Sequence, residues 1–228
     1  MEDRSPNSLL LVFTNCKGPA EEEALAQWYN LEYVPAVAAT GLFASASRWL
    51  NTDYPAIAEH KGLTIFEDGA DPVVTHTKLL KRSSFKWLDH GGRKHPSLTD
   101  AKPMLFTKIA TVNRPGTSMA GKKSQGFMLV FSDCTDRAGE AEFNKWYTEE
   151  HLPGVISRWG FYTASRWLNV KPQPGDRKYL ALYEYENDPT EMFKAMHERL
   201  SGLSKGVRTV KTPSGLANTI HWLFRRVG

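Results

Sequence analysis

The chain has 228 residues, of which 41% are hydrophobic and 24% are charged, so it can bury a sizeable core as one large domain or two small ones. Lys and Arg outnumber Asp and Glu by only 29 to 25, without a long basic run, which argues against binding to a phosphate backbone. No stretch approaches the roughly 18 apolar residues of a membrane span, and the amino-terminal residues do not resemble a secretion signal. We therefore expect a folded cytoplasmic protein that binds neither nucleic acid nor membrane.

The sequence contains an internal repeat. Shifted by 118 positions, residues 8–51 match residues 126–169 at 18 of 44 positions. After a one-residue gap the match resumes at a shift of 117, which places Leu63 on Leu180. Self-similarity of this kind indicates a tandem duplication. It predicts an N-terminal repeat over 1–112, a polar linker over 113–125 that we expect to be mobile, and a C-terminal repeat over 126–228.

Each repeat predicts the same order of elements. The first strand is a short apolar run typical of a strand buried on both faces, and the long helix after it carries an apolar stripe with a bend at Pro35 or Pro153. A pair of strands, a second helix and a last strand follow; the longer connection of the first repeat covers 83–103. The expected strands are 9–14, 43–50, 62–67 and 105–112, then 127–132, 161–170, 178–186 and 218–224, with the long helices over 20–40 and 138–159.

The order strand, helix, strand, strand, helix, strand is that of a ferredoxin-like unit, an α+β fold with both helices on one face of a four-stranded antiparallel sheet. The other face of each sheet is too apolar for water. We therefore expect the two sheets to pack face to face as one pseudo-twofold barrel within the chain.

Two segments carry a family resemblance. WYTEEHLPGVISRWGFYTASRWLN at 146–169, echoed by WYNLEYVPAVAATGLFASASRWLN at 28–51, combines an aromatic pair, Glu-His-x-Pro and Phe-x-x-Ala-x-Arg-Trp. The combination resembles EthD-like proteins of the dimeric α+β barrel superfamily, which implies two ferredoxin-like units in one barrel. Relatives in that superfamily include cyclases, dehydratases, decarboxylases, cofactor-free oxygenases, haem-binding enzymes and proteins without known activity. The fold does not choose among these functions, so each activity needs its own residues.

His151 is the candidate catalytic residue. It shares the apolar stripe of its helix with Tyr147 and Val155 and should therefore face the sheet. An imidazole there can accept and return a proton near pH 7, as general acid/base chemistry on a phenolic or β-keto substrate requires. The alternative is a core histidine that is hydrogen-bonded to a Tyr or Glu. Because Tyr33 stands at the matching position of the first repeat, we expect any chemistry to lie in the second.

Further residues around His151 are candidates for substrate binding. Arg48 and Arg166 recur in both repeats among apolar neighbours, where a charge needs a partner. That partner is either Glu32 and Glu150 of the helices or a substrate carboxylate or phenolate. Tryptophans in such positions are more often core packing than ligand stacking, and the histidine beside Trp222 could equally face solvent. The candidate substrate-binding residues are Trp146, Tyr147, Glu150, Arg166, His221 and Tyr33.

The sequence predicts neither a disulfide nor a metal site. Cys16 and Cys134 occupy equivalent strand ends and are expected as free thiols. No His or Cys has the spacing of metal ligands. The histidines expected in loops or on polar helix faces are His60, His76, His90, His95 and His197.

Three functions stay open from the sequence. The first is a cofactor-independent lyase, cyclase or dehydratase that acts on an apolar aromatic or polyketide-like molecule through His151. The second is a binding or partner protein without chemistry, for which a second copy of the chain is one candidate partner. The third is a haem or oxygen enzyme with a histidine as axial ligand.

Overall fold

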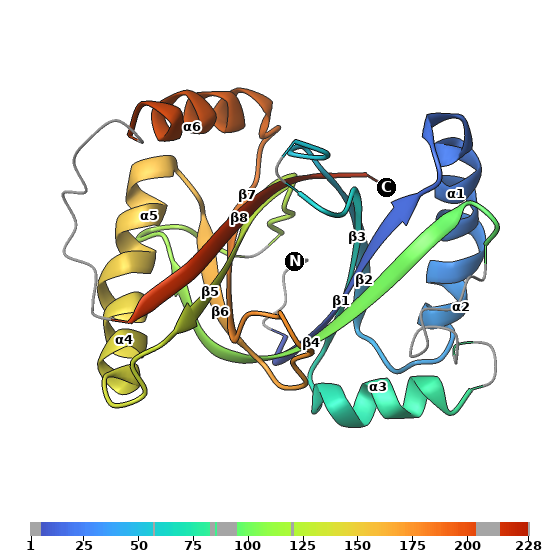
Figure 1. The fold of residues 1–228 in the computed structure, drawn as a ribbon, viewed down its shortest axis with the longest axis horizontal. Helices are drawn as coiled ribbons and strands as arrows, with labels where there is room; N and C mark the ends of the chain where they lie inside the picture. The colour runs from blue at the N-terminus through green and yellow to red at the C-terminus, as the bar shows by residue number, and fades with distance from the viewer. Residues whose placement is uncertain are drawn as a thin grey trace.

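The computed structural model describes residues 6–56, 58–82, 85, 95–119, 121–203 and 215–227, with side chains described in α6 only for residues 190–196 and 198. The predicted order of elements is confirmed in both repeats (Figure 1). The N-terminal repeat contains β1 (Ser8–Cys16), a 3-10 turn (Pro19–Glu21), α1 (Glu22–Trp28), a π-helical turn (Tyr29–Tyr33), α2 (Val34–Ala38), β2 (Ser45–Asn51), β3 (Gly62–Asp68), α3 (Pro72–Leu80) and β4 (Leu98–Asn113). The C-terminal repeat contains β5 (Gly126–Cys134), α4 (Glu140–Trp146), a π-helical turn (Tyr147–His151), α5 (Leu152–Trp159), β6 (Thr163–Asn169), β7 (Tyr179–Tyr185), α6 (Thr190–Leu203) and β8 (Leu216–Arg226).

The eight strands form one closed antiparallel barrel in the order β1-β3-β2-β8-β5-β7-β6-β4. The two sheets that were expected to pack face to face are also joined at their edges, because β4 pairs with β6 and β8 pairs with β2. The last strand of each repeat is longer than predicted, since it must reach neighbours in both repeats. Part of the connection expected over 83–103 belongs to β4, and residues 83–84 and 86–94 lie outside the described part of the chain.

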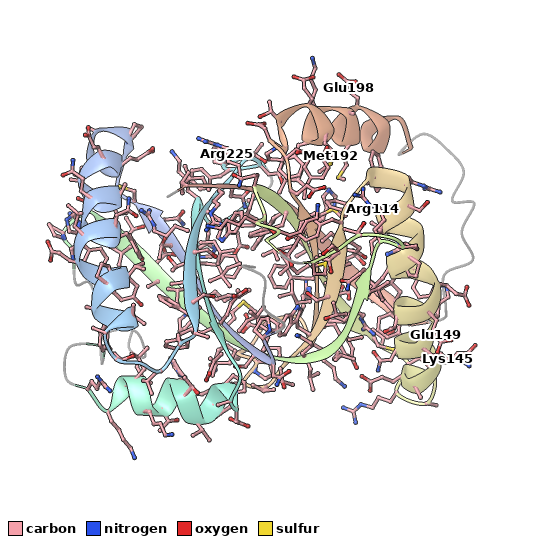
Figure 2. All side chains as sticks on the ribbon, turned by 180° about the vertical axis from the view of Figure 1, so that it is seen from behind. Arg114, Lys145, Glu149, Met192, Glu198 and Arg225 are labelled. Atoms are coloured by element: carbon pink, nitrogen blue, oxygen red, sulfur yellow. The ribbon has the colours of Figure 1, made fainter. Side chains whose placement is uncertain are left out.

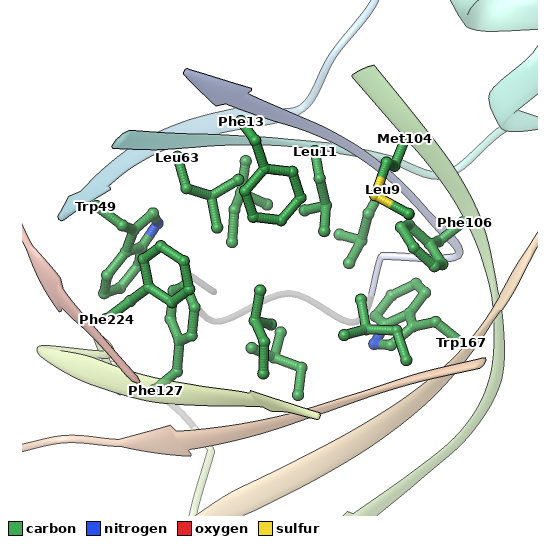
Figure 3. Close-up of a cluster of buried hydrophobic side chains, with 14 of the residues drawn as sticks. Leu9, Leu11, Phe13, Trp49, Leu63, Met104, Phe106, Phe127, Trp167 and Phe224 are labelled. Carbon is green, nitrogen blue, oxygen red and sulfur yellow. The ribbon is translucent and has the colours of Figure 1, made fainter. Parts of the chain in front are cut away.

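The barrel interior is a packed apolar core shared by both repeats (Figure 3). The Trp49 and Phe127 rings, which come from different repeats, lie with centroids 4.4 Å apart. Side chains on alternate positions of every strand reach this core, which explains the continuous apolar runs of β1 and β5. Its buried members are Leu9, Leu11, Phe13, Trp49, Leu63, Ile65, Met104, Phe106, Phe127, Leu129, Phe131, Trp167, Leu180, Leu182 and Phe224.

The helices cover the outside of the barrel, with α1–α3 over one repeat and α4–α6 over the other (Figure 1). The bend predicted in each long helix takes the form of a π-helical turn. The Val34 N–H bonds the Tyr29 carbonyl five residues earlier, and the Leu152 N–H bonds that of Tyr147. Proline follows immediately in both cases and has no N–H to continue the α-helical pattern. The π turns therefore interrupt each helix where the candidate residues lie.

The second helices begin at capping aspartates. The Asp188 carboxylate accepts from the Thr190 N–H at 2.8 Å, and Asp71 caps α3 in the same way. On α6, Met192 points toward the sheet and Glu198 points away from it (Figure 2). No helix in the described ranges is long and apolar enough to cross a membrane.

The connection between the repeats is attached at its C-terminal end. Ser124 is fully buried, and its hydroxyl contacts the Tyr162 hydroxyl at 2.8 Å and donates to the Glu184 carboxylate. Lys122 forms an ion pair with Glu186. The mobility expected for 113–125 stays a prediction for the middle of the segment. Both cysteines are free thiols, as predicted.

Candidate functional site

The N-terminal repeat contains a cavity of about 320 Å³ between α1 and the outer face of the sheet. Strands β1, β2 and β3 form its floor, and the helix forms its wall. Apolar and charged side chains both contribute to the lining. The lining residues are Thr14, Cys16, Glu22, Glu23, Leu25, Ala26, Tyr29, Asn30, Arg48, Leu50, Lys61, Gly62 and Val227.

Arg48 is the central charged group of this cavity. Its guanidinium carbon lies 4.7 Å from the centroid of the Tyr29 ring. Nη1 donates to the Ala26 carbonyl at 3.1 Å and to Asn30 Oδ1 at 2.8 Å. Within the described residues, Nη1 alone among the guanidinium nitrogens donates a hydrogen bond. Burial lowers the pKa of Arg48, but a guanidinium keeps its charge at neutral pH.

Other polar groups also line the cavity. Glu22 of α1 forms an ion pair with Lys61, which precedes β3. Burial raises the pKa of Tyr29, at the start of the π-helical turn, to about 12, a shift that the nearby Thr14 hydroxyl opposes. Tyr29 is therefore a protonated phenol at neutral pH and acts as a hydrogen-bond group rather than a base.

In the C-terminal repeat, protein side chains fill the same space. Arg166 is 0% exposed, and its guanidinium carbon lies 4.3, 5.0 and 5.3 Å from the ring centroids of Tyr147, Tyr179 and Phe143. Nη1 donates to the Asn144 carbonyl at 3.3 Å, the bond that Arg48 makes in the first repeat. Tyr179 and Phe143 replace the smaller Gly62 and Leu25.

The carboxylate partners considered for the arginines are not present. Glu32 and Glu150 are exposed on the helices, and the two guanidinium groups contact backbone carbonyls and aromatic rings instead. That part of the sequence interpretation is wrong. Figure 2 shows the neighbouring Glu149 and Lys145 pointing away from the sheet. A role for Glu150 in substrate binding stays a prediction.

His151 lies in a packed aromatic environment. Its ring centroid is 4.9 Å from that of Trp146 and 4.6 Å from that of Tyr147. Burial, with a further effect from the Arg166 charge, lowers the pKa of His151 to about 4, so the imidazole is neutral at pH 7. It does not line the cavity of the first repeat. Its catalytic role stays a prediction.

The structure brings some of the other candidates close to His151. Trp146 and Tyr147 lie in the same apolar cluster, and Arg166 contacts the Tyr147 ring. His221 is partly exposed on the helix-facing side of β8, where Leu223 joins that cluster. Tyr33, the counterpart of His151, is 2% exposed and stacks on Trp28 with centroids 5.2 Å apart.

Sequence reasoning missed the cavity of the first repeat. The signal was present in the repeat alignment, where Gly62 stands opposite Tyr179 and Leu25 opposite Phe143. Two smaller residues aligned with two large aromatic ones, one pair on the helix and one on the sheet beneath it, indicate that the two repeats are filled unequally. The Glu-His-x-Pro motif instead indicated a site in the C-terminal repeat, which contains His151.

A second cavity, of about 130 Å³, lies at one end of the barrel. Equivalent residues of both repeats line it, including Phe13 with Phe131, so it lies on the pseudo-twofold axis. His60 lines it too, and its Nε2 lies 3.1 Å from Asp100 Oδ2. His60 lies in the loop between β2 and β3, as expected, but is buried there, and burial of His76 on α3 corrects its placement on a polar face.

Comparisons with known proteins address the fold. No protein-family model matches the sequence, and no curated protein matches it either. Solved structures do match: an anthrone oxidase-like protein is 14% identical over 100% of this chain and 94% of its own, with a TM-score of 0.59. A chlorite dismutase mutant from Candidatus Nitrospira defluvii is 13% identical over 99% and 93%, with a TM-score of 0.53. A proposed monooxygenase from Lactobacillus acidophilus is 10% identical over 96% and 94%, with a TM-score of 0.54.

The chain has the dimeric α+β barrel fold. In this dimeric α+β barrel a single chain supplies both ferredoxin-like units, as the repeat predicts. At identities of 10% to 14% the likeness extends to the fold and not to the chemistry.

Proposed function

We propose that this protein binds a small molecule with an apolar, aromatic body in the cavity of the N-terminal repeat. The observation that carries the proposal is an open space of about 320 Å³ that combines apolar walls with the Arg48 guanidinium. Small-molecule sites typically have about 300–1,000 Å³ and a few polar groups that fix orientation. Among the described residues of the second repeat, Phe143 and Tyr179 occupy the equivalent space beside Arg166.

A thermal-shift screen of small aromatic compounds tests this proposal, because a bound ligand raises Tm by mass action. The matched variant is Leu25→Phe, which copies Phe143 of the second repeat and narrows the cavity. Compounds that occupy the cavity should raise the Tm of the wild type and lose most of this effect in Leu25→Phe. Shifts of equal size in both proteins would place the ligands elsewhere.

The catalytic form of the proposal is an EthD-like, cofactor-independent lyase, cyclase or dehydratase with His151 as general acid/base. It is supported by the sequence motif and by an imidazole that is neutral at pH 7. His151→Ala should then lower turnover by roughly 100- to 10,000-fold, and Tyr33→Phe should cost far less. With a pKa of about 4, the limb of the pH profile that depends on His151 belongs near pH 4 rather than near neutrality. Equal losses from both substitutions would assign the histidine a structural role.

The geometry favours binding over catalysis as the primary function. His151 belongs to the filled repeat, whereas the open cavity belongs to the other repeat and has no histidine in its lining. A ligand that raises Tm and is recovered unchanged after long incubation would support a binding protein.

The residues present do not fit a haem with a histidine as axial ligand. Such a haem needs a histidine beside a large cavity, but the larger cavity has no histidine in its lining. The cavity that includes His60 has about 130 Å³, below the usual range for small-molecule sites. A Soret band in the purified protein would contradict this conclusion.

A further inference from the structure

We propose that the ligand of the N-terminal cavity is a hydroxyarene, held where the Tyr179 side chain lies in the C-terminal repeat. The inference rests on the proposed function, because it names the ligand class of the same cavity. Its basis is the duplication: the chain contains two copies of one arrangement, of which one is filled by its own phenol and the other is open.

Gly62 and Tyr179 occupy equivalent places in the two sheets. The repeat alignment matches them, and the strand register agrees. Gly62 pairs opposite Thr14, and Tyr179 pairs opposite Ser132, which is the residue equivalent to Thr14. The Tyr179 ring therefore extends over the part of its sheet that corresponds to the cavity floor.

Tyr179 has defined contacts in the second repeat. Its ring lies 5.0 Å from the Arg166 guanidinium carbon and 5.6 Å from the Phe143 ring centroid. Its hydroxyl donates to Glu140 and accepts from Asn144 Nδ2 at 3.4 Å. Glu140 also pairs with a lysine, in the way that Glu22 pairs with Lys61.

The residues equivalent to these four contacts all line the open cavity. Arg48 and Glu22 are identical to their counterparts, so the cation beneath the ring and the carboxylate that accepts from the hydroxyl are present in the first repeat. Leu25 and Ala26 are smaller than Phe143 and Asn144, so the cavity has room beyond one ring but lacks the amide donor of Asn144.

The chemistry of the lining selects this class. A flat ring on Arg48 would cover the guanidinium as Tyr179 covers Arg166, and cation–π attraction is strongest when the cation is shielded from water. The hydroxyl would donate to the Glu22 carboxylate, a charge-assisted hydrogen bond. A methyl ether has no proton to donate, and an arene carboxylate would be repelled by Glu22. The extra room admits a second fused ring.

The test uses 4-methylphenol and 2-naphthol as probes, with their methyl ethers as controls, in calorimetric titrations of the full chain. The phenols should bind the wild type at one site, and the ethers should bind at least about ten-fold more weakly because a charge-assisted hydrogen bond is lost. Glu22→Gln should weaken binding of the phenols and leave that of the ethers nearly unchanged.

A double variant copies the filled repeat. A Cβ added at Gly62 would lie 2.6 Å from Thr14 Oγ1, so Gly62→Tyr is combined with Thr14→Ser, the residue found opposite Tyr179. The double variant should lose at least about ten-fold in affinity for both phenols. Tyr183→Phe, a buried change in the second repeat and outside the cavity lining, serves as the control and should retain binding.

The reverse variant, Tyr179→Gly, empties the second repeat. It should gain a site for 4-methylphenol, seen as a larger rise of Tm with this probe than in the wild type. If this variant does not fold, the double variant of the first repeat decides alone.

Three results would overturn the inference: no binding of either phenol to the wild type, equal affinity in the double variant, or equal affinity for phenols and ethers. If neither phenol binds but the Tm shift of another compound is lost in Leu25→Phe, the cavity binds a small molecule, as proposed, that is not a hydroxyarene. If no compound loses its Tm shift in Leu25→Phe, the proposed function is refuted as well.

Discussion

Single residues decide how differently the two repeats treat one arginine. Arg48 and Arg166 donate equivalent hydrogen bonds to a helix carbonyl and lie over equivalent tyrosine rings. The aromatic rings of Phe143 and Tyr179 then enclose Arg166 completely, whereas Arg48 stays partly exposed. An unpaired buried charge is costly unless its surroundings compensate, and three aromatic faces provide that compensation.

Replacing each arginine by lysine should reveal this difference. Arg166→Lys should lower the free energy of unfolding by about 1–3 kcal/mol, because a compact ammonium cannot lie flat against three rings. Arg48→Lys should cost less than about 1 kcal/mol, because its site is partly hydrated. Urea unfolding of both variants measures the two costs, and equal losses would refute the role assigned to the rings.

His151 should make stability depend on pH. Its pKa is about 4 in the folded protein and about 6.5 when unfolded, so below pH 6.5 the unfolded chain takes up a proton that the folded chain does not. Stability should therefore fall as the pH drops from 6.5 toward 4, by up to about 1.4 kcal/mol per unit, and His151 should contribute no slope above pH 6.5.

His151→Gln should remove this part of the slope in urea unfolding between pH 7 and 4.5. Burial also lowers the pKa of His60, so the difference between the variant and the wild type is the informative quantity. An unchanged slope would mean that His151 titrates normally in the folded protein.

At the scale of elements, the barrel is closed by two unequal seams. The β4–β6 seam pairs residues from Phe106 to Asn113 with β6, whereas the β2–β8 seam pairs only Trp49–Asn51 with β8. A buried carboxylate reinforces the short seam: Asp53 Oδ2 accepts from the Leu223 N–H at 2.7 Å. The loop after β2 thus supplies contacts that the short ladder lacks.

Asp53→Ala should open the short seam. Loss of this acceptor leaves a buried N–H unpaired, which costs about 1–3 kcal/mol. Hydrogen exchange should accelerate at the Leu223 amide far more than at Leu129 in the centre of β5. Asp71→Ala, which removes only the cap of α3, should cost about 1 kcal/mol and leave Leu223 unchanged. Exchange at Leu223 that stays as slow as in the wild type would exclude a role for Asp53 in the seam.

Elements were predictable from the sequence where local pattern and topology agree. The apolar runs of β1 and β5 and the Asp188 cap follow from alternation and capping, which are local. The π turns were foreseen only as bends, because the hydrogen-bond register before a proline depends on how the helix packs. The cavity could not be predicted from the motif, because it results from the sizes of residues from separate elements, such as Leu25 and Gly62.

At the scale of the whole molecule, the two repeats depend on each other for a core. The interior cluster draws side chains from all eight strands, and contacts such as Trp49 on Phe127 cross between repeats. Each repeat alone would expose one apolar sheet face and two sheet edges. The duplication was therefore sufficient to predict that the two sheets pack against each other, because each ferredoxin-like unit with this pattern has one apolar sheet face to cover.

Residues 126–228 produced alone should therefore not behave as a stable monomer. They should self-associate through the face that carries Phe127 and Phe131, or bind residues 1–112 in a one-to-one complex when the two are mixed. Size-exclusion chromatography with light scattering distinguishes these states. A monomer with cooperative unfolding would show that the shared core is dispensable.

Closure of the barrel also limits how this molecule can meet other chains. Every strand of the described part of the chain has a neighbour on both sides, so a visiting strand finds no fully open sheet edge there. Backbone groups with a strand on one side only lie beyond the ends of the two seams, for example beside the three paired residues of β2. Strand addition by a partner is confined to these short stretches, and a larger interface must be built from side chains on the helices, the connecting loops or the ends of the barrel.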